Sequence, residues 1–240
     1  MHNNAAVSSL NPNHKRLPLW LRIGFWICTA IAVAVVIRRI FALAASPRSS
    51  AAPQLAVLDN FFASHAPLTL AHIIPALAFV LVAPFVVLRG RAWAERLIYP
   101  LGAVVGVTAY AMSSHAIGGW TERSAVLFFN TLFLISLFRA FLYRRKGDPQ
   151  RSRVWLLRAI AILLGIATTR PVMGLFFATS PLTHLTPQQF FGIAFWIGFS
   201  INTLVFELWI RSRSRTREAI PLPPVNDGDQ DHSRVQLRRT

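Results

Sequence analysis

The sequence predicts an all-α integral membrane protein, a bundle of six transmembrane helices with both chain termini in the cytoplasm. Hydrophobic residues make up 54% of the chain and charged residues only 14%, a composition unlike that of a water-soluble domain. The apolar residues form long runs, each able to cross a bilayer at 1.5 Å of helical rise per residue. Arginine and lysine gather on alternate connections between these runs, as the positive-inside rule requires. Residues 18–210 are therefore expected to form one membrane domain.

Six runs of mainly apolar residues are the expected spans, at residues 19–41, 68–88, 97–117, 125–143, 154–178 and 190–210. The polar segment 1–17 is expected to be a cytoplasmic tail, and the basic segment 211–240 to be a disordered one. A cleaved signal peptide is the alternative for the first run, because a basic pair, an apolar segment and a small-residue triplet at 42–44 follow in that order. Arg38 and Arg39 interrupt the run before that triplet, which favours a retained span.

Counting lysine and arginine sets the orientation. With both termini inside, the cytoplasmic set is Lys15, Arg16, Arg89, Arg91, Arg96, Arg144, Arg145, Lys146, Arg151, Arg153 and the four arginines from Arg211 to Arg217. The outer connections then keep only Arg48 and Arg123, with Arg38 and Arg39 added if the first span ends before them. This asymmetry predicts a multi-pass protein of the bacterial inner membrane whose cytoplasmic arginines contact anionic lipid. It also explains the net charge of +16 without a nucleic-acid partner.

Common metal and nucleotide motifs are absent from the sequence, including HExxH, CxxCH, a Walker glycine loop and GxGxxG before a helix. The single cysteine, Cys28, lies inside the first run, so no intramolecular disulfide can form. We therefore expect no metal site and favour a protein that is not an enzyme. Gly102 and Gly106 in the third span form a GxxxG pattern, which favours the close approach of a neighbouring helix.

Polar residues within the spans are the candidate functional residues, because a charged group in hydrocarbon is costly unless it has a partner or a role. An outer layer, about 5 to 12 Å above the midplane by residue counting, holds His72, Tyr110, His115, Asn130, Thr168, Thr169 and Arg170. Arg170 precedes Pro171, whose ring removes a backbone donor and loosens the helix. A buried cation beside histidines and hydroxyls suits an anionic solute or lipid. The alternative is that these groups snorkel or tie helices together.

An inner layer of polar residues holds Arg139, Arg158, Asn202, Thr203 and Glu207. Glu207 is the only acid within any expected span, and its depth matches that of Arg158 on the preceding span. We therefore expect Arg158 and Glu207 to form a buried ion pair that locks two helices together. A proton or ion relay is the alternative for these two residues.

Three functions are open at the level of the sequence. The favoured one is a polar intramembrane site under the outer face that handles a small anionic solute or lipid, with no cofactor. The second is a membrane redox protein in which His72 and His115, on successive antiparallel spans, ligate haem b and Arg170 contacts a propionate. The third is a non-catalytic helper that packs against another membrane protein or a second copy of this chain.

A series of residues between His72 and Arg211 follows an order found in one bacterial family. The residues are His72, Arg89, Arg96, Gly118, Trp120, the segment Trp155 to Arg158, Arg170, Trp196, Asn202 and Glu207. In this order they resemble a family of predicted membrane proteins known as domain of unknown function 2306. The resemblance implies a helical membrane fold and a role for His72, Arg158, Arg170 and Glu207, but no activity. Family members carry histidines where this chain has Glu95 and Ser152, so ligation by those positions is not implied here.

Overall fold

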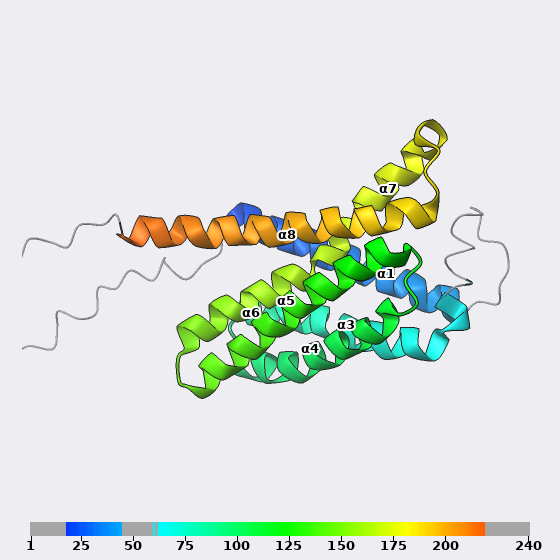
Figure 1. Cartoon of the computed structure of the whole chain (residues 1–240). Helices are drawn as coiled ribbons and strands as arrows, with labels where there is room; N and C mark the ends of the chain where they lie inside the picture. The colour runs from blue at the N-terminus through cyan, green and yellow to red at the C-terminus, as the bar shows by residue number, and fades with distance from the viewer. Residues whose placement is uncertain (1–17, 45–59, 61, 219–240) are drawn as a thin grey trace, which may run out of the picture. The chain divides into compact units, whose positions relative to one another are not determined.

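The computed structural model describes residues 18–44, 60 and 62–218, and every regular element in these ranges is an α-helix (Figure 1). The helices are α1 (Leu19–Ala44), α3 (Ala66–Val87), α4 (Ala92–Ser113), α5 (Gly119–Arg145), α6 (Pro149–Leu163), α7 (Gly165–Thr183) and α8 (Pro187–Glu218). The chain divides into two compact units, residues 1–204 and 205–240. The expected N-terminal tail at 1–17 lies outside the described residues.

Five helical segments are long and apolar enough to cross a membrane, namely Leu19–Ala44, Ala66–Val87, Gly119–Arg145, Pro149–Thr183 and Gln188–Arg213. Large apolar side chains on these helices are exposed, among them Ile74, Phe138 and Leu175, which is typical of surfaces that contact lipid. The described part of the chain is thus an all-helical protein with several helices suited to a bilayer. α4 falls outside this set, and its first turn carries Glu95 and Arg96.

The helix ends differ from the expected span limits. α4 runs from Ala92 to Ser113 instead of 97–117, and α5 begins at Gly119 instead of residue 125. Sequence reasoning stopped each span at charged residues, whereas acids such as Glu122 are stabilised in the first turn of a helix by its dipole. α8 continues to Glu218, so residues 211–218, expected to be disordered, are helical. Residues 219–240 lie outside the described part of the chain.

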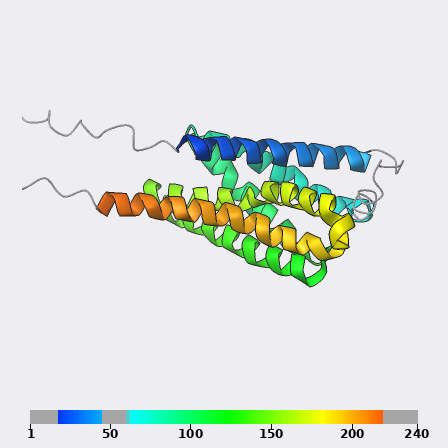
Figure 2. The ribbon, with the colours of Figure 1, turned by 90° about the horizontal axis from the view of Figure 1, so that it is seen from above.

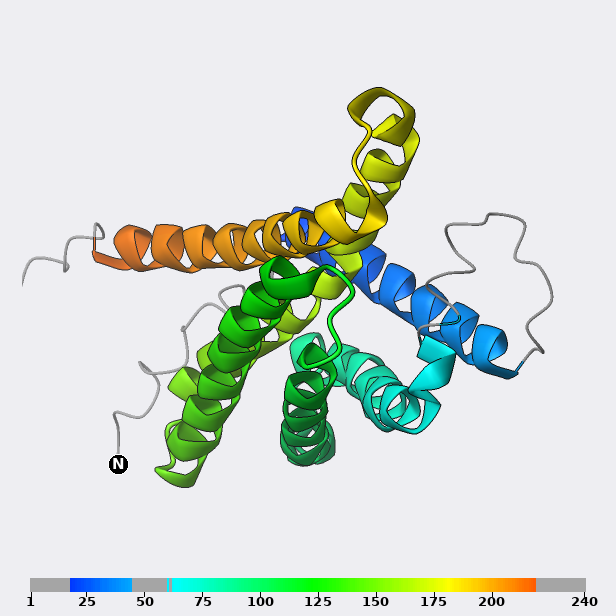
Figure 3. The same ribbon diagram turned by 45° about the vertical axis from the view of Figure 1, so that its right-hand side comes forward.

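The fifth expected span, 154–178, is two helices with a break at Leu164. Gly165 follows the break, and a Cβ on it would lie 2.9 Å from the Cα of Phe199 on α8. Two causes account for the break at this point. Glycine disfavours a helical conformation, and α8 approaches closely here. Pro171, expected to loosen the span, lies inside α7. α7 ends at His184, whose backbone is left-handed (φ 54°), and the chain turns back into α8 (Figure 3).

Helices that follow one another in sequence pack side by side. α3 packs along α4, α4 along α5 and α5 along α6, as short connections between antiparallel helices dictate. α1 contacts both α3 and α7, and it lies along one side of these helices (Figure 2). The arrangement leaves the starts of α3 and α5 and the end of α4 at one end of the first unit.

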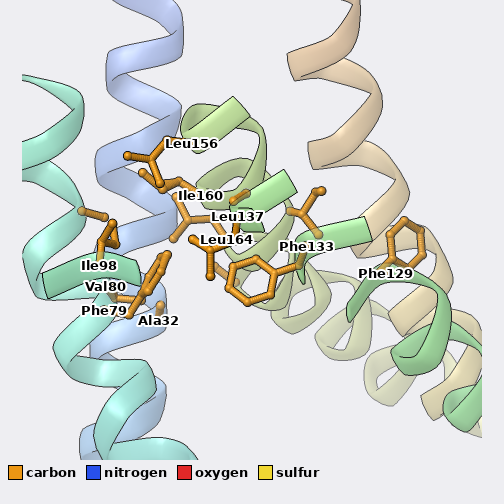
Figure 4. Packing of buried hydrophobic residues seen from close by; sticks show 14 of the residues in the cluster. Ala32, Phe79, Val80, Ile98, Phe129, Phe133, Leu137, Leu156, Ile160 and Leu164 are labelled. Carbon is orange, nitrogen blue, oxygen red and sulfur yellow. The ribbon is translucent and has the colours of Figure 1, made fainter. Parts of the chain in front are cut away.

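The apolar core includes residues of every described helix, and Figure 4 shows its part between α3, α4, α5 and α6, where Phe79, Ile98 and Leu137 lie close together. Phe79 of α3 meets Phe133 of α5 edge to face, with 5.9 Å between ring centroids. Gly102 and Gly106 of α4 make room for α5: added Cβ atoms would lie 2.7 Å from Leu137 Cδ2 and 2.4 Å from Leu134 Cδ2, respectively. The close helix approach expected from the GxxxG pattern is confirmed.

The opposite end of the first unit holds a polar network that ties α4, α5 and α6 together. Ser152 Oγ donates a hydrogen bond to the carbonyl oxygen of Ala140 at 2.8 Å and lies 3.4 Å from Tyr99 Oη. Glu95 forms an ion pair with Arg144. Glu95 and Ser152 are the positions at which the resembling family has histidines, and in this chain they join helices to one another.

Candidate functional site

A cavity of about 250 Å³ lies among the helices of the first unit, and each described helix contributes to its wall. Most wall residues are apolar, and Phe129 and Phe133 of the core form part of it (Figure 4). Pockets with apolar walls and a few convergent polar groups are the usual form of a site for a small molecule. This cavity is therefore the candidate site in the described part of the chain.

Charged and imidazole side chains occur in the cavity wall only toward one end. They are Arg39, His65, His72, His115, Glu122 and Arg170. The opposite end of the wall, which we call the deep end, is formed by Ala32, Val80, Val105, Phe133, Ile162 and Phe199. The charged end lies where α3 and α5 begin and where α1, α4 and α7 end. The polarity of the cavity therefore changes along the helix axes. The cavity is amphipathic.

Arg170 of α7 lies at the charged end of the cavity wall. Its Nε is buried without a hydrogen-bond partner, and its Nη1 lies 3.9 Å from Met173 Sδ, which is a weak acceptor. Arg170 keeps part of its surface accessible and lines the cavity. Among the described residues, no carboxylate lies within ion-pair distance of it. The Arg170 side chain is thus incompletely hydrogen-bonded, and the accessible part of the residue lies at the cavity.

The electrostatic surroundings of Arg170 are mainly positive. The charges of Arg38 and Arg39 on α1 and of Glu122 on α5 all act on it. Among the described residues, two cations and one anion therefore act on Arg170, which is itself a poorly solvated cation. Such a cluster attracts a negatively charged group, because buried charges require compensation.

Glu122 is held in place by the backbone of its own helix start. Its Oε2 accepts a hydrogen bond from the Gly118 amide at 2.6 Å, and the residue is buried. A Cβ on Gly192 of α8 would lie 2.6 Å from the Glu122 amide nitrogen, so the two backbones are in contact here. The expected span began at residue 125, whereas α5 begins at Gly119 and carries Glu122 in its first turn.

His72 has one ring nitrogen fixed by α4. Its Nδ1 lies 2.9 Å from Thr108 Oγ1, and that hydroxyl donates to the Val104 carbonyl oxygen at 2.7 Å. We assign the hydroxyl hydrogen to this carbonyl, and with that assignment Nδ1 is the donor to Thr108. Neutral His72 therefore keeps Nε2 as an acceptor, on a residue that lines the cavity.

The rim of the charged end is formed by two aromatic contacts. The rings of His65 and His115 lie 4.3 Å apart between centroids. The guanidinium of Arg39 lies over the ring of Phe62, 4.0 Å from its centroid. All four residues line the cavity, so α1, α3 and the end of α4 meet at this rim.

The structure brings together four of the six candidate ligand-binding residues: His72, His115, Asn130 and Arg170 all line the cavity. Asn130 Nδ2 also donates to the Gly106 carbonyl oxygen at 2.9 Å, so it joins α5 to α4. The other two candidates are not in the cavity wall and make helix contacts. Tyr110 Oη lies 2.7 Å from Thr131 Oγ1, and Thr169 Oγ1 donates to the Ile166 carbonyl oxygen at 2.6 Å.

A second polar contact joins α7 to α8 away from the cavity. Thr168 Oγ1 donates to Asn202 Oδ1 at 2.7 Å, and Cys28 Sγ lies 3.9 Å from the same threonine oxygen. At these residues the structure favours the alternative stated above, in which polar side chains tie helices together.

Sequence reasoning missed Arg39, His65 and Glu122 as site residues. Each lies at or beyond the end of an expected span, where a charge or imidazole is read as a membrane-surface residue. One signal was available: the segments Ser64–Ala66 and Ser114–Ala116 both read Ser-His-Ala, at the start of one expected span and the end of the next. In an antiparallel pair these two segments lie at the same end.

The expected Arg158–Glu207 ion pair stays a prediction, because the two residues belong to different units of the chain. Within the first unit, the Arg158 guanidinium lies 4.4 Å from the ring centroid of Trp155, and that of Arg139 lies 4.8 Å from the same centroid. Two arginines thus share one indole ring, a favourable cation–π arrangement.

Comparison with known proteins adds no relative. No family model, no curated protein and no solved structure matches this chain. The resemblance to domain of unknown function 2306 stays a prediction, and the function has to be inferred from the cavity.

Proposed function

We propose that this protein is a multi-pass protein of the bacterial inner membrane that binds a small anionic solute or lipid in the amphipathic cavity. The observation that carries the proposal is Arg170, whose Nε is buried without a hydrogen-bond partner beside a cavity that the residue lines. An arginine in such surroundings is costly to keep unless an anion compensates it. A carboxylate or phosphate accepts two parallel N–H donors from a guanidinium, which makes it the matching group.

The cavity serves this role within a six-span topology, with both termini and the connections 88–91 and 146–148 cytoplasmic. α4 supports a sixth span because it packs between α3 and α5 and is joined to both by short connections. The charged end of the cavity then lies under the outer face. Arginines on the inner connections contact anionic lipid.

Reporter fusions test this topology. Fusions after residues 92, 148 and 215 are expected to report a cytoplasmic location, and those after 65, 120 and 185 a periplasmic one. Periplasmic activity at residue 92 or 148 would contradict the proposed orientation and would place the charged end on the cytoplasmic side.

Ligand-dependent stability tests the binding function. Dodecanoate, supplied at a measured free concentration, is expected to raise the midpoint of thermal unfolding of the purified protein, because it binds only the folded state. At a free concentration 100 times the dissociation constant the gain is about 2.7 kcal/mol. Arg170→Gln is expected to lose the response, whereas Arg139→Gln, which changes an exposed arginine outside the cavity wall, keeps it. An equal response of wild type and Arg170→Gln would refute the proposal.

Haem binding is the second candidate, and one observation favours it. Neutral His72 keeps Nε2 as an acceptor at the cavity, which is the nitrogen that an iron would need. Against it, the ring of His115 already contacts the ring of His65, 4.3 Å away between centroids. A visible spectrum of the purified protein decides: a Soret band that shifts on reduction and is lost in His72→Ala would replace the anion proposal.

A non-catalytic helper is the function left if neither ligand binds. The helper would pack against a partner membrane protein or a second copy of this chain. Co-purification from membranes is the measurement for that case.

A further inference from the structure

We propose that the ligand of the cavity is a single-chain amphiphile, an aliphatic chain that ends in a carboxylate or a phosphate. Its head lies at Arg170 and its chain extends to the deep end near Val80 and Phe133. This inference rests on the proposed function, which requires only an anion at Arg170. It adds that the anion carries one long apolar chain, and that the bound molecule has its head at the outer, charged end of the cavity.

The separation of charge along the cavity is the first observation behind this inference. The charged wall residues lie at one end, and the wall residues of the deep end are Ala32, Val80, Val105, Phe133, Ile162 and Phe199, all apolar. A fully polar solute that filled this space would lose its hydration at the deep end without replacement hydrogen bonds. An aliphatic chain has no such cost there.

The length of the cavity is the second observation. Along α3 its wall residues run from Leu68 to Val80, a rise of about 18 Å at 1.5 Å per residue. Along α5 the wall residues run from Glu122 to Phe133, about 16 Å by the same measure. The cavity wall is thus long along the helix axes, and an extended chain can lie along it from the charged end to the deep end.

The one polar side chain along the middle of the wall is already engaged. Asn130 donates its amide to the Gly106 carbonyl oxygen at 2.9 Å, and this bond fixes the side chain across the α4–α5 contact. Among the described wall residues, Arg170 at the charged end is the one with a buried donor that lacks a hydrogen-bond partner. The head of the ligand is therefore expected at Arg170, with its chain directed toward the deep end.

A chain-length series tests the inference on the full-length protein in detergent. Alkanoates with 4, 8, 12 and 16 carbons are compared at free concentrations set by dialysis, with dodecyl phosphate as the second head group and dodecyltrimethylammonium as the cationic control. Each methylene that leaves water is expected to tighten binding about fourfold, up to the length that fills the cavity. The cationic amphiphile is expected not to bind. The two anionic heads distinguish a carboxylate site from a phosphate site.

Two alanine variants of α3 make the test specific to the cavity. Ala76 lines the cavity one turn beyond His72, and Ala71 is exposed on the same helix and does not line it. Ala76→Phe is expected to block the way to the deep end, so that the 12- and 16-carbon chains lose at least about tenfold in affinity while the 4-carbon chain does not. Ala71→Phe is the matched control and is expected to keep the wild-type series.

The outcomes separate the inference from the proposed function. If butyrate and hexadecanoate bind equally tightly and both require Arg170, the anion site stands and the chain inference is wrong. If Ala76→Phe leaves the chain-length dependence unchanged, the chain does not lie in the cavity and the inference is wrong. If no anion of any length binds, the proposed function itself fails.

Discussion

Gly198→Ala is expected to lower the free energy of unfolding by about 3 kcal/mol, at the upper end of the usual cost of overpacking. A Cβ at this position of α8 would lie 2.6 Å from the backbone nitrogen of Thr169 and 2.8 Å from its Cα. Thr169 is fully buried in α7, so its backbone cannot move aside without shifting that helix. Because Arg170 is the next residue, the same shift is expected to weaken anion binding. Denaturant titration of helicity in detergent measures the change.

Gly174→Ala is the matched control for this substitution. Gly174 lies in the same α7 segment as Thr169, and a Cβ on it would have no neighbour within 4 Å. Alanine has the higher helix propensity, so this variant is expected to be more stable than wild type by up to about 1 kcal/mol. If Gly198→Ala and Gly174→Ala change the free energy of unfolding by the same amount, α7 and α8 are not packed as described.

Arg170→Met is expected to raise the stability of the ligand-free protein by about 1 to 4 kcal/mol while abolishing anion binding. Methionine fills a similar volume without a charge, and replacing a buried charge by a well-packed apolar side chain is often stabilising. The gain is expected because Arg170 has an unpartnered Nε and is acted on by two cations, Arg38 and Arg39, against one anion, Glu122. The free energy of unfolding, measured after exhaustive removal of bound lipid, checks this prediction.

A structural arginine would behave in the opposite way. If Arg170 served only to join helices, Arg170→Met would destabilise the protein, and the loss of binding would follow from unfolding. Stabilisation together with loss of ligand response is the pattern of a residue retained for function at a cost in stability.

The sequence was sufficient to predict the helical class and the approximate position of the five helical segments that are long and apolar enough to cross a membrane. Long apolar runs report directly on helices in lipid, which is why 19–44 and 66–87 lie close to the expected ranges. It was insufficient at charged helix starts: the apolar pattern ends at residue 125, whereas α5 begins at Gly119 and carries Glu122 in its first turn. The break at Leu164 depends on the approach of Phe199, which no local pattern encodes.

Depth counting explains both the success and the failure at the site. It included His72, His115, Asn130 and Arg170, which line one cavity, because residues at similar depth on adjacent helices are near one another. It carries no information on which side of a helix faces a cavity, so Tyr110 and Thr169 were included although they make contacts between and within helices. Arg39 and His65 were left out because they lie at span ends, where snorkelling is the usual interpretation.

Locating the bound ligand tests the central claim most directly. An experimental density map of the protein with dodecanoate carrying a bromine at its terminal carbon would show both ends of the molecule. We predict the carboxylate within about 3 Å of the Arg170 guanidinium and the bromine among Val80, Phe133 and Ile162 at the deep end. A map in which the cavity is empty and the amphiphile lies on the outer surface of the helices would contradict the account.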